Sequence, residues 1–389
     1  MVEKASYAEF PKDEYLMRLS RVRERMQSSQ LDALFLTMYE NLVYFAGYRT
    51  WLLISKHRPF TLLLTLDRDP VLFLPPLEAG DGMAFSWVED VRYWPSNGDY
   101  ISLYADTIKS MGLASARIGS EFGGDTQIGM SLNDWHRFES LLPDVKWVDA
   151  SWLIWLIRAI KSPREIERME QSCAILDGSV AACWAALRPG VTQRDLARAV
   201  GVSMMGNMAD VPNFLIIRTG EDGWYMGNPP SSDKVVKEGD IVSIDIGCIY
   251  RDYHSDMIRL ASLGEPSRQY REWHAAAVHV AQVVREATRP GITIGDLCEV
   301  RRHVTAEFGV PAAWAGIGHA IGLTTHELPR VDPGIEDSEF VLEPGFVFTV
   351  EPGLSYDGRI CAIEDVVVVT ETGHRSLTHA PRELYIASA

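Results

Sequence analysis

Five side chains of the kinds that bind metal ions lie in the C-terminal part of the sequence, each inside or beside a short apolar segment typical of a β-strand. In chain order they are Asp245, Asp256, His319, Glu351 and Glu364. An unpaired charge buried among apolar residues costs several kcal/mol. Each carboxylate must therefore be protonated, paired or neutralised by a cation. A bound metal ion is the simplest way to satisfy all of them at once.

The first two aspartates lie on either side of a predicted hairpin. Residues 241–250 form an apolar, β-rich run that follows a Gly-Asp turn, and residues 251–259 predict a hairpin that returns into a second strand. Adjacent antiparallel strands would bring Asp245 and Asp256 together. The pair is therefore predicted to lie on neighbouring strands.

The remaining three candidates repeat this pattern. His319 lies in residues 316–323, where small residues let the backbone approach a neighbour closely. Glu351 ends an apolar run, and Glu364 lies in residues 361–370, which predict one strand. Four carboxylates and one imidazole suit a pair of divalent ions such as manganese, cobalt, iron or zinc, and suit neither a thiolate zinc site nor an iron–sulfur cluster.

These segments resemble the motifs of the creatinase, aminopeptidase P and prolidase family. The matching stretches are Asp245-Ile-Gly with Ser255-Asp256, Gly318-His319-Ala-Ile-Gly322 with His326-Glu327, Thr349-Val-Glu351-Pro-Gly353, and Ile363-Glu364-Asp365. The resemblance implies a C-terminal α+β catalytic domain with the pita-bread fold, a curved and mostly antiparallel sheet covered by helices. It also implies an α/β N-terminal domain of the kind that larger family members carry.

The resemblance also implies roles for single residues. Asp245 would chelate one metal ion, Asp256 and Glu364 would bridge both, and His319 and Glu351 would hold the second. A metal-bridging hydroxide would attack the carbonyl carbon of an amide or imide bond, with Glu351 handling the proton. His326 would stabilise the oxyanion, so that Glu351 and His326 are the predicted catalytic residues.

The chain departs from the family's peptidases at three substrate-side positions. Where those enzymes typically have two histidines and an arginine, this sequence has Asn228, Ala315 and Ala362. The leading prediction is a dinuclear metal-dependent hydrolase resembling Xaa-Pro dipeptidases and aminopeptidases. The alternative, favoured by these losses, is a non-peptidase on the same fold, either a small-molecule amidohydrolase or a lyase of the dimethylsulfoniopropionate type. Lyases usually add an aspartate at the position of Gly247, which weakens that variant, and the complete ligand set argues against a catalytically silent binding protein.

Length and patterning predict two domains. The chain has 389 residues, 47% of them hydrophobic, which is enough for two cores. A polar, proline-bearing stretch at residues 160–165 separates two apolar regions, and the expected domains are residues 1–157 and 158–389. Apolar residues at Leu16, Leu19, Val22 and Met26 predict a first helix. Further predicted elements are strands at 31–36, 60–66 and 71–74 and helices at 100–111, 133–142, 165–187 and 193–208.

Aromatic and basic residues outside the metal motifs are candidate substrate-binding groups. Arg49, Trp51 and His57 lie in a loop of the N-terminal domain, and family resemblance allows such a loop to wall the active site of a partner subunit. Tyr225, Asn228 and Trp314 lie beside the metal segments and would line the cleft. Ordinary packing is the competing interpretation for each aromatic residue.

Two short segments, Pro189-Gly-Val-Thr192 and Pro290-Gly-Ile-Thr293, are near-copies that each end one helical run and begin another. They indicate an internal duplication, in agreement with the two related halves of the pita-bread fold.

Charge and cysteine content narrow the partners and the compartment. The net charge of −16 and the lack of a long basic run argue against nucleic acid and anionic membranes as partners. No apolar N-terminal stretch or segment of spanning length occurs. Five scattered cysteines without a CxxC spacing are expected to be buried in a reducing compartment. The expected protein is cytoplasmic, a homodimer by resemblance, and acts on a small molecule or short peptide.

Overall fold

The computed structural model describes residues 8–54, 59–95, 98–221, 224–225, 227–334 and 337–388. The chain forms two compact units, Met1–Ile157 and Arg158–Ala389. Within the described ranges, no helix is both long enough and apolar enough to cross a membrane.

The first unit is built on a six-stranded mixed sheet with the order β4-β3-β2-β1-β5-β6. The central strands β1, β2 and β3 are buried at every position, which indicates that both faces of the sheet are covered. The strands are β1 (Ala33–Leu36), β2 (Thr61–Thr65), β3 (Val71–Leu74), β4 (Asp90–Tyr93), β5 (Arg117–Ser120) and β6 (Lys146–Asp149). The helices are α1 (Lys12–Ser28), α2 (Tyr39–Ala46), α3 (Tyr100–Ser110), α4 (Leu132–Leu141) and α5 (Ser151–Ala159), with short 3-10 turns at Trp51–Ile54, Pro76–Glu78 and Asp81–Phe85.

The predicted strands and helices of this unit are confirmed, with one correction in α1. Leu19, Val22 and Met26 are buried as the periodicity predicts, but Leu16 is 47% exposed. The buried stripe of the helix instead includes Tyr15 and Arg18. An arginine in this stripe is tolerated because it donates to the carbonyl oxygen of Tyr44 at 2.9 Å and pairs with Glu14.

The second unit contains three sheets, in which most neighbouring strands are antiparallel. The first has the order β10-β9-β11-β19 with β7 also paired to β9, the second β13-β12-β14-β17-β18, and the third β15-β16-β8. The first-sheet strands are β7 (Val211–Glu221), β9 (Asp240–Tyr250), β10 (Tyr253–His254), β11 (Met257–Leu263) and β19 (Tyr385–Ala387). The others are β12 (Gly318–Ala320), β13 (Glu327–Val331), β14 (Val347–Val350), β17 (Asp365–Val369), β18 (His374–Ser376), β8 (Trp224–Tyr225), β15 (Leu354–Tyr356) and β16 (Arg359–Cys361).

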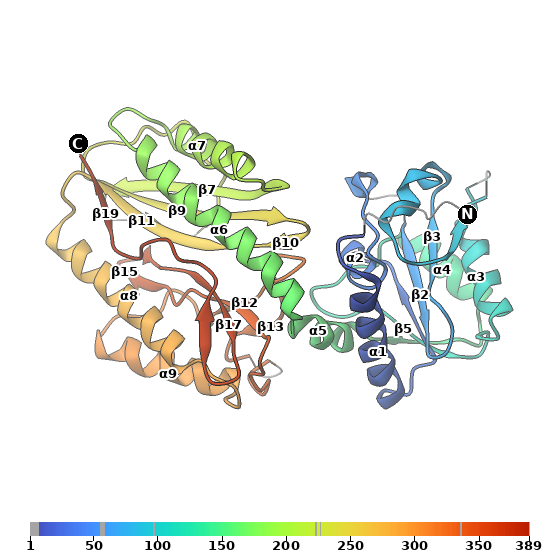
Figure 1. Cartoon of the computed structure of the whole chain (residues 1–389). Helices are drawn as coiled ribbons and strands as arrows, with labels where there is room; N and C mark the ends of the chain where they lie inside the picture. The colour runs from blue at the N-terminus through green and yellow to red at the C-terminus, as the bar shows by residue number, and fades with distance from the viewer. Residues whose placement is uncertain are drawn as a thin grey trace. The chain divides into compact units, whose positions relative to one another are not determined.

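Four long helices cover these sheets. Helices α6 (Pro163–Ala186) and α7 (Gln193–Gly206) pack on β9 and β7, whereas α8 (Arg268–Ala287) packs on β14, β15 and β16 and against α9 (Ile294–Glu307). Figure 1 shows α6 and α7 in green along the first sheet and α8 and α9 in orange beside the second. The predicted helices at 165–187 and 193–208 are confirmed as α6 and α7. The expected curved sheet with covering helices is confirmed as well.

The two near-identical proline-glycine segments have the same local structure. Gly190 and Gly291 both have φ of 86°, in the left-handed region. Thr192 and Thr293 each cap the following helix in a capping box with the aspartate three residues later. Thr192 also bridges to Val235, and Thr293 to Val341. The same turn and capping box therefore begin a helix in each half of the unit, which supports the predicted internal duplication.

One predicted strand is wrong in its extent. Residues 361–370 form two strands, because β16 ends at Cys361 and β17 begins at Asp365. The chain between them leaves the three-stranded sheet and enters the second sheet, and the amide of Glu364 donates to the carbonyl oxygen of Ile258 at 3.3 Å. This crossing places Glu364 at the junction of two sheets, beside β11 of the first sheet.

Candidate metal centre

The four candidate carboxylates lie at equivalent places in the two main sheets. Asp245 lies within β9 and Asp256 directly before β11, and these strands are antiparallel with Asp245 opposite Ile258. Glu351 directly follows β14 and Glu364 directly precedes β17, which are antiparallel neighbours of the second sheet. The predicted hairpin pairing of the two aspartates is therefore observed. Each half of the unit contributes two acids to one place.

His319 joins this group from β12. A Cβ atom at Gly318 would lie 2.1 Å from the carbonyl oxygen of Thr349, so only glycine lets β12 approach the chain so closely at this point. The approach allows the amide of His319 to donate to Oγ1 of Thr349 at 3.1 Å. The close backbone approach that the small residues of this segment predict is therefore observed.

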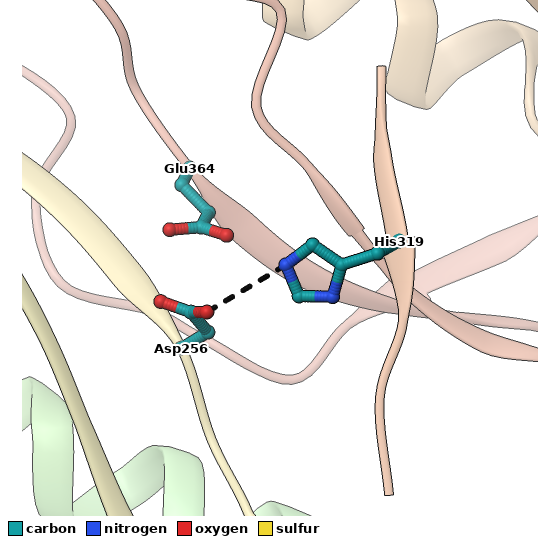
Figure 2. Close-up of side chains that lie close together, drawn as sticks. All are labelled: Asp256, His319 and Glu364. Carbon is teal, nitrogen blue, oxygen red and sulfur yellow. Dashed lines mark ion pairs between the residues drawn. The ribbon is translucent and has the colours of Figure 1, made fainter. Parts of the chain in front are cut away.

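Three of the five side chains form a compact cluster. One possible ligand atom each of Asp256, His319 and Glu364 lies within 4.8 Å of the other two, and all three residues are buried. Figure 2 shows the two carboxylates facing each other, with the imidazole ring directed toward Asp256. Nε2 of His319 lies 3.7 Å from Oδ2 of Asp256 and 3.5 Å from Oε1 of Glu351. Asp245 lines the same cavity as these residues, and its Oδ2 is 3.4 Å from Nη2 of Arg218.

The imidazole of His319 is held in the form that binds metals. Its Nδ1 lies 3.1 Å from the carbonyl oxygen of Ala320, and this hydrogen bond requires a proton on Nδ1 because a carbonyl oxygen only accepts. Burial, together with the nearby His326, lowers the pKa of His319 to about 3. The ring is therefore neutral, and the lone pair of Nε2 points toward the acids.

The acids lack sufficient countercharge from the protein. Burial, followed by the neighbouring carboxylates, raises the pKa of Asp256 and Glu364 well above the ordinary range. Burial and Asp245 raise the pKa of Glu351 to about 8, and burial raises that of Asp245 to about 6 despite Arg218. In the described part of the chain, Oδ1 of Asp256 and Oε1 of Glu364 are buried without a hydrogen-bond partner. Carboxylate oxygens that lack a hydrogen-bond partner are suitable ligands for divalent metal ions.

Two cavities adjoin the cluster and share Asn228, Asp245 and Glu351. The larger has a volume of about 290 Å³ and is lined by Asn213, Phe214, Ile216, Asp256, His319, Thr325, His326 and Glu364. The smaller, of about 230 Å³, is lined by Arg218, Gly227, Ile258, Trp314 and Ile360. The site thus consists of two adjoining cavities that share acidic residues and that have both polar and apolar side chains in their walls.

The predicted catalytic histidine lies at this pocket. His326 is exposed, lines the larger cavity and has its ring centre 4.3 Å from that of His319. Glu327 holds the loop that carries this histidine, because its carboxylate accepts hydrogen bonds from the amides of Leu323 at 3.0 Å and Thr324 at 3.4 Å. Glu327 is itself paired with Arg158 and Lys161.

The predicted substrate-binding residues are only partly brought together. Asn228 and Trp314 line the smaller cavity. The backbone of Tyr225 belongs to β8, but its side chain lies outside the described residues, as does all of His57. In the first unit, Trp51 is 74% exposed and Arg49 pairs with Glu9.

The three positions at which the chain departs from the family's peptidases have different surroundings in the structure. Ala362 is fully buried in an apolar core, and Ala315 is exposed with its carbonyl oxygen bonded to Arg301. Asn228 accepts a hydrogen bond from Arg218, a cavity residue that sequence reasoning missed. The sequence feature that could have revealed it is a single arginine at the end of the apolar run Phe214-Leu-Ile-Ile-Arg218.

Gly247 has no room for the aspartate that a lyase of this fold would place there. A Cβ atom at this position would lie 2.4 Å from the ring of Phe214 and 2.6 Å from the carbonyl oxygen of Ser255. The packing around β9 therefore excludes that variant of the site.

Residues 167–371 match the pattern of metallopeptidase family M24, and residues 18–160 match the creatinase/prolidase N-terminal domain. The chain belongs to metallopeptidase family M24. The predicted resemblance, the pita-bread fold and the class of metal-dependent hydrolase are thereby confirmed. Members of this family use divalent metal ions, which agrees with the donor set of the cluster.

Similar proteins match this chain over nearly its whole length. A Xaa-Pro dipeptidase of Pyrococcus horikoshii is 27% identical over 370 residues, covering 94% of this chain and 98% of that protein. Dipeptidase PepE of Mycobacterium ulcerans has a crystal structure with a TM-score of 0.84 at 28% identity, covering 98% of this chain and 100% of that chain. The prolidase of Pyrococcus horikoshii gives a TM-score of 0.81 at 26% identity, over 95% and 99% of the two chains.

Proposed function

We propose that this M24 protein is a Xaa-Pro dipeptidase that holds two divalent metal ions with Asp245, Asp256, His319, Glu351 and Glu364. The observation that carries the proposal is that four carboxylates and one neutral imidazole line one cavity. Two of these acids, Asp256 and Glu364, are buried, and each has an oxygen without a hydrogen-bond partner in the described residues. The names of the similar proteins support the choice of substrate.

The positions of the ligands support their division between two ions. Asp256 and Glu364 face each other, as bridging ligands would (Figure 2). Nε2 of His319 lies 3.5 Å from Oε1 of Glu351, whereas Oδ2 of Asp245 contacts Nη2 of Arg218. When bound, such ions lower the pKa of a water molecule and polarise a carbonyl group.

The chain's own groups would bind the substrate and move the proton. Glu351 reaches both cavities and would take a proton from the attacking water and deliver it to the leaving nitrogen. His326, at the open side of the larger cavity, would donate a hydrogen bond to the oxygen of the scissile carbonyl. Phe214, Ile216 and Trp314 provide apolar walls against which a prolyl ring could pack.

Hydrolysis assays with defined metals test this function. Metal-stripped protein would be reconstituted separately with manganese, cobalt, zinc and iron and assayed on Xaa-Pro dipeptides and on longer Xaa-Pro peptides. Oxygen-rich ligand sets favour manganese among these ions, and dipeptides are expected to be the better substrates. Glu351→Gln should abolish turnover, and the exposed control Glu343→Gln should retain it. A folded, metal-loaded protein that cleaves no peptide of the panel would overturn the proposal.

We also propose a homodimer in which the first unit of one subunit contributes to the other's site. Trp51, an exposed aromatic side chain, supports a contact of this kind. Light scattering would measure the mass of the assembly, and an unchanged KM in Trp51→Ala would contradict the contribution to the site. A cytoplasmic location is proposed because all five cysteines are buried as free thiols.

A further inference from the structure

Asn213 is the extra residue of a β-bulge in strand β7. The register between β7 and β9 shifts between Pro212, which lies opposite Cys248, and Phe214, which lies opposite Gly247. Asn213 is thereby left without a residue opposite it on β9. A bulge changes the direction of a side chain, and bulges are common beside active sites. Here the side chain of Asn213 is exposed and lines the larger cavity.

Asn213 belongs to a group of three polar side chains that hydrogen-bond to one another. Its Nδ2 donates to Oγ1 of Thr325 at 2.6 Å and lies 3.1 Å from Nδ1 of His254. Nδ1 of His254 in turn lies 3.0 Å from Oγ1 of Thr325. We call Asn213, His254 and Thr325 the polar trio. It joins β7 and β10 of the first sheet to the loop before β13, which carries His326.

The polar trio cannot satisfy all of its own hydrogen-bonding groups. With Nδ2 of Asn213 as the donor, Nδ1 of His254 is an acceptor, and it has a single lone pair. A hydrogen on Nδ2 of Asn213 and the hydroxyl hydrogen of Thr325 compete for that lone pair, so one of them is left for another acceptor. Both side-chain hydrogen bonds of Asn213 among the described residues involve Nδ2, which leaves Oδ1 as an acceptor. The trio can therefore offer a ligand one donor and one acceptor.

The polar trio lies close to the group that would hold the scissile carbonyl. Thr325 directly precedes His326, and Asn213, Thr325 and His326 all line the larger cavity. In a Xaa-Pro substrate, the carbonyl group that His326 would contact belongs to residue Xaa. The side chain of Xaa is separated from that carbonyl group by one Cα atom. It is therefore the part of the substrate that the polar trio can reach.

We propose that Asn213 and Thr325 are specificity-determining residues that bind the side chain of Xaa. The preferred substrates then carry an amide or a hydroxyl group in this side chain, because such groups both donate and accept hydrogen bonds. His254 is a positioning residue that orients the two others. This inference rests on the proposed Xaa-Pro peptidase function and names a substrate class within it.

Two pairs of dipeptides with side chains of similar shape test this role. Asparaginyl-proline is compared with leucyl-proline, and threonyl-proline with valyl-proline. In the wild type, kcat/KM should be higher for the polar member of each pair. Asn213→Ala or Thr325→Val should reduce this ratio by roughly 3- to 10-fold, since each removes a hydrogen bond that water can partly replace at an exposed position. The exposed control Asn133→Ala should keep the wild-type ratio.

A role in positioning the loop alone predicts a different result. If the polar trio only held Thr325, and with it His326, Asn213→Ala would lower kcat for all four dipeptides by the same factor. The ratios within both pairs would then equal those of the wild type, which would overturn the inference. A wild type that prefers the apolar members would overturn it as well. Thr325→Val keeps the shape of the side chain, so the test does not depend on the folding of Asn213→Ala.

Calorimetric binding separates this inference from the proposed function. If no dipeptide is cleaved, binding of the same four compounds to metal-loaded protein takes the place of the kinetics. Tighter binding of the polar members that is lost in Asn213→Ala would then leave the inference standing, whereas the peptidase function would fall. Cleavage with ratios that neither variant changes would overturn the inference and leave the function standing. Absence of both cleavage and selective binding would overturn both.

Discussion

Glu364 and Asp365 are neighbours in the sequence and are equally buried, yet their surroundings are opposite. Asp365 is surrounded by Arg259, Arg285 and Arg382, each within 2.7 Å of one of its oxygens. Burial alone would raise its pKa, but the three arginines outweigh burial and lower the pKa to about 2. Glu364 faces other acids instead, and burial together with Asp256 and Glu351 raises its pKa.

The difference shows two ways in which one fold can bury a carboxylate. Where the chain provides cations, as at Asp365 and at Glu327 with Arg158 and Lys161, the acid is part of the framework. Where the chain provides too few, as at Glu364 and Asp256, we propose that cations from solution complete the site. A deficit of protein cations around buried acids is therefore what distinguishes the candidate metal centre from the ion pairs beside it.

The largest effect on activity is expected from Glu364→Gln. Removal of this proposed bridging ligand should abolish peptidase activity and metal binding at this site. The metal-free variant should nevertheless be as stable as the metal-free wild type to within about 1 kcal/mol, because an uncompensated buried acid contributes little to stability. Urea unfolding of the two stripped proteins checks this result. A large loss of stability would place Glu364 with the framework acids.

Asp365→Asn is the matched variant one residue away. It leaves three arginines without their common anion, so the free energy of unfolding should fall by about 3–5 kcal/mol with or without metal. Chemical denaturation of the stripped and loaded proteins measures both values. If Asp365→Asn were no less stable than Glu364→Gln, the distinction between the two acids would be lost.

Glu327→Gln should have a smaller effect, at the low end of the same range, about 3 kcal/mol. One of its partners is Lys161, whose pKa is already lowered by burial, so that this partner can shed its charge when Glu327 is lost. An arginine side chain remains charged, so it cannot lose its charge in this way. The exposed Glu343→Gln serves as the control in the same denaturation series.

The stability that Glu327 provides should also depend on pH. Burial would raise its pKa, but Arg158 and Lys161 outweigh burial and lower it below the ordinary value of 4.5. The stabilisation is therefore fully present above about pH 4.5 and is lost as the pH falls through the pKa of the folded state. The difference between wild type and Glu327→Gln should shrink in acid, and a difference that grows in acid would contradict this assignment.

The sequence was sufficient to predict the residues that converge on the site. Asp245, Asp256, His319, Glu351 and Glu364 lie in short motifs, and the structure places all five along one cavity. The apolar strands around them predict burial, which is observed for Asp256, His319 and Glu364. The helices α6 and α7 were also predictable, because each begins at a capping residue and has a regular apolar face.

Features that depend on contacts between distant segments were not predictable. The stretch at residues 160–165 is polar in sequence but largely buried, since Lys161 pairs with Glu327 far along the chain. The break between β16 and β17 follows from the crossing between two sheets, which no local pattern marks. Arg218 was missed for the same reason, because its partner Asn228 lies beyond the end of its strand.

Calorimetric titration of metal-stripped protein with manganese tests the central claim most directly. The account predicts that the wild type binds two ions per chain, and that the double variant Asp256→Asn, Glu364→Gln binds none while Asp365→Asn, if folded, still binds two. Direct metal analysis after dialysis would confirm the stoichiometry. Failure of the wild type to bind metal, or binding that survives in the double variant, would contradict the claim that these buried acids are completed by cations from solution.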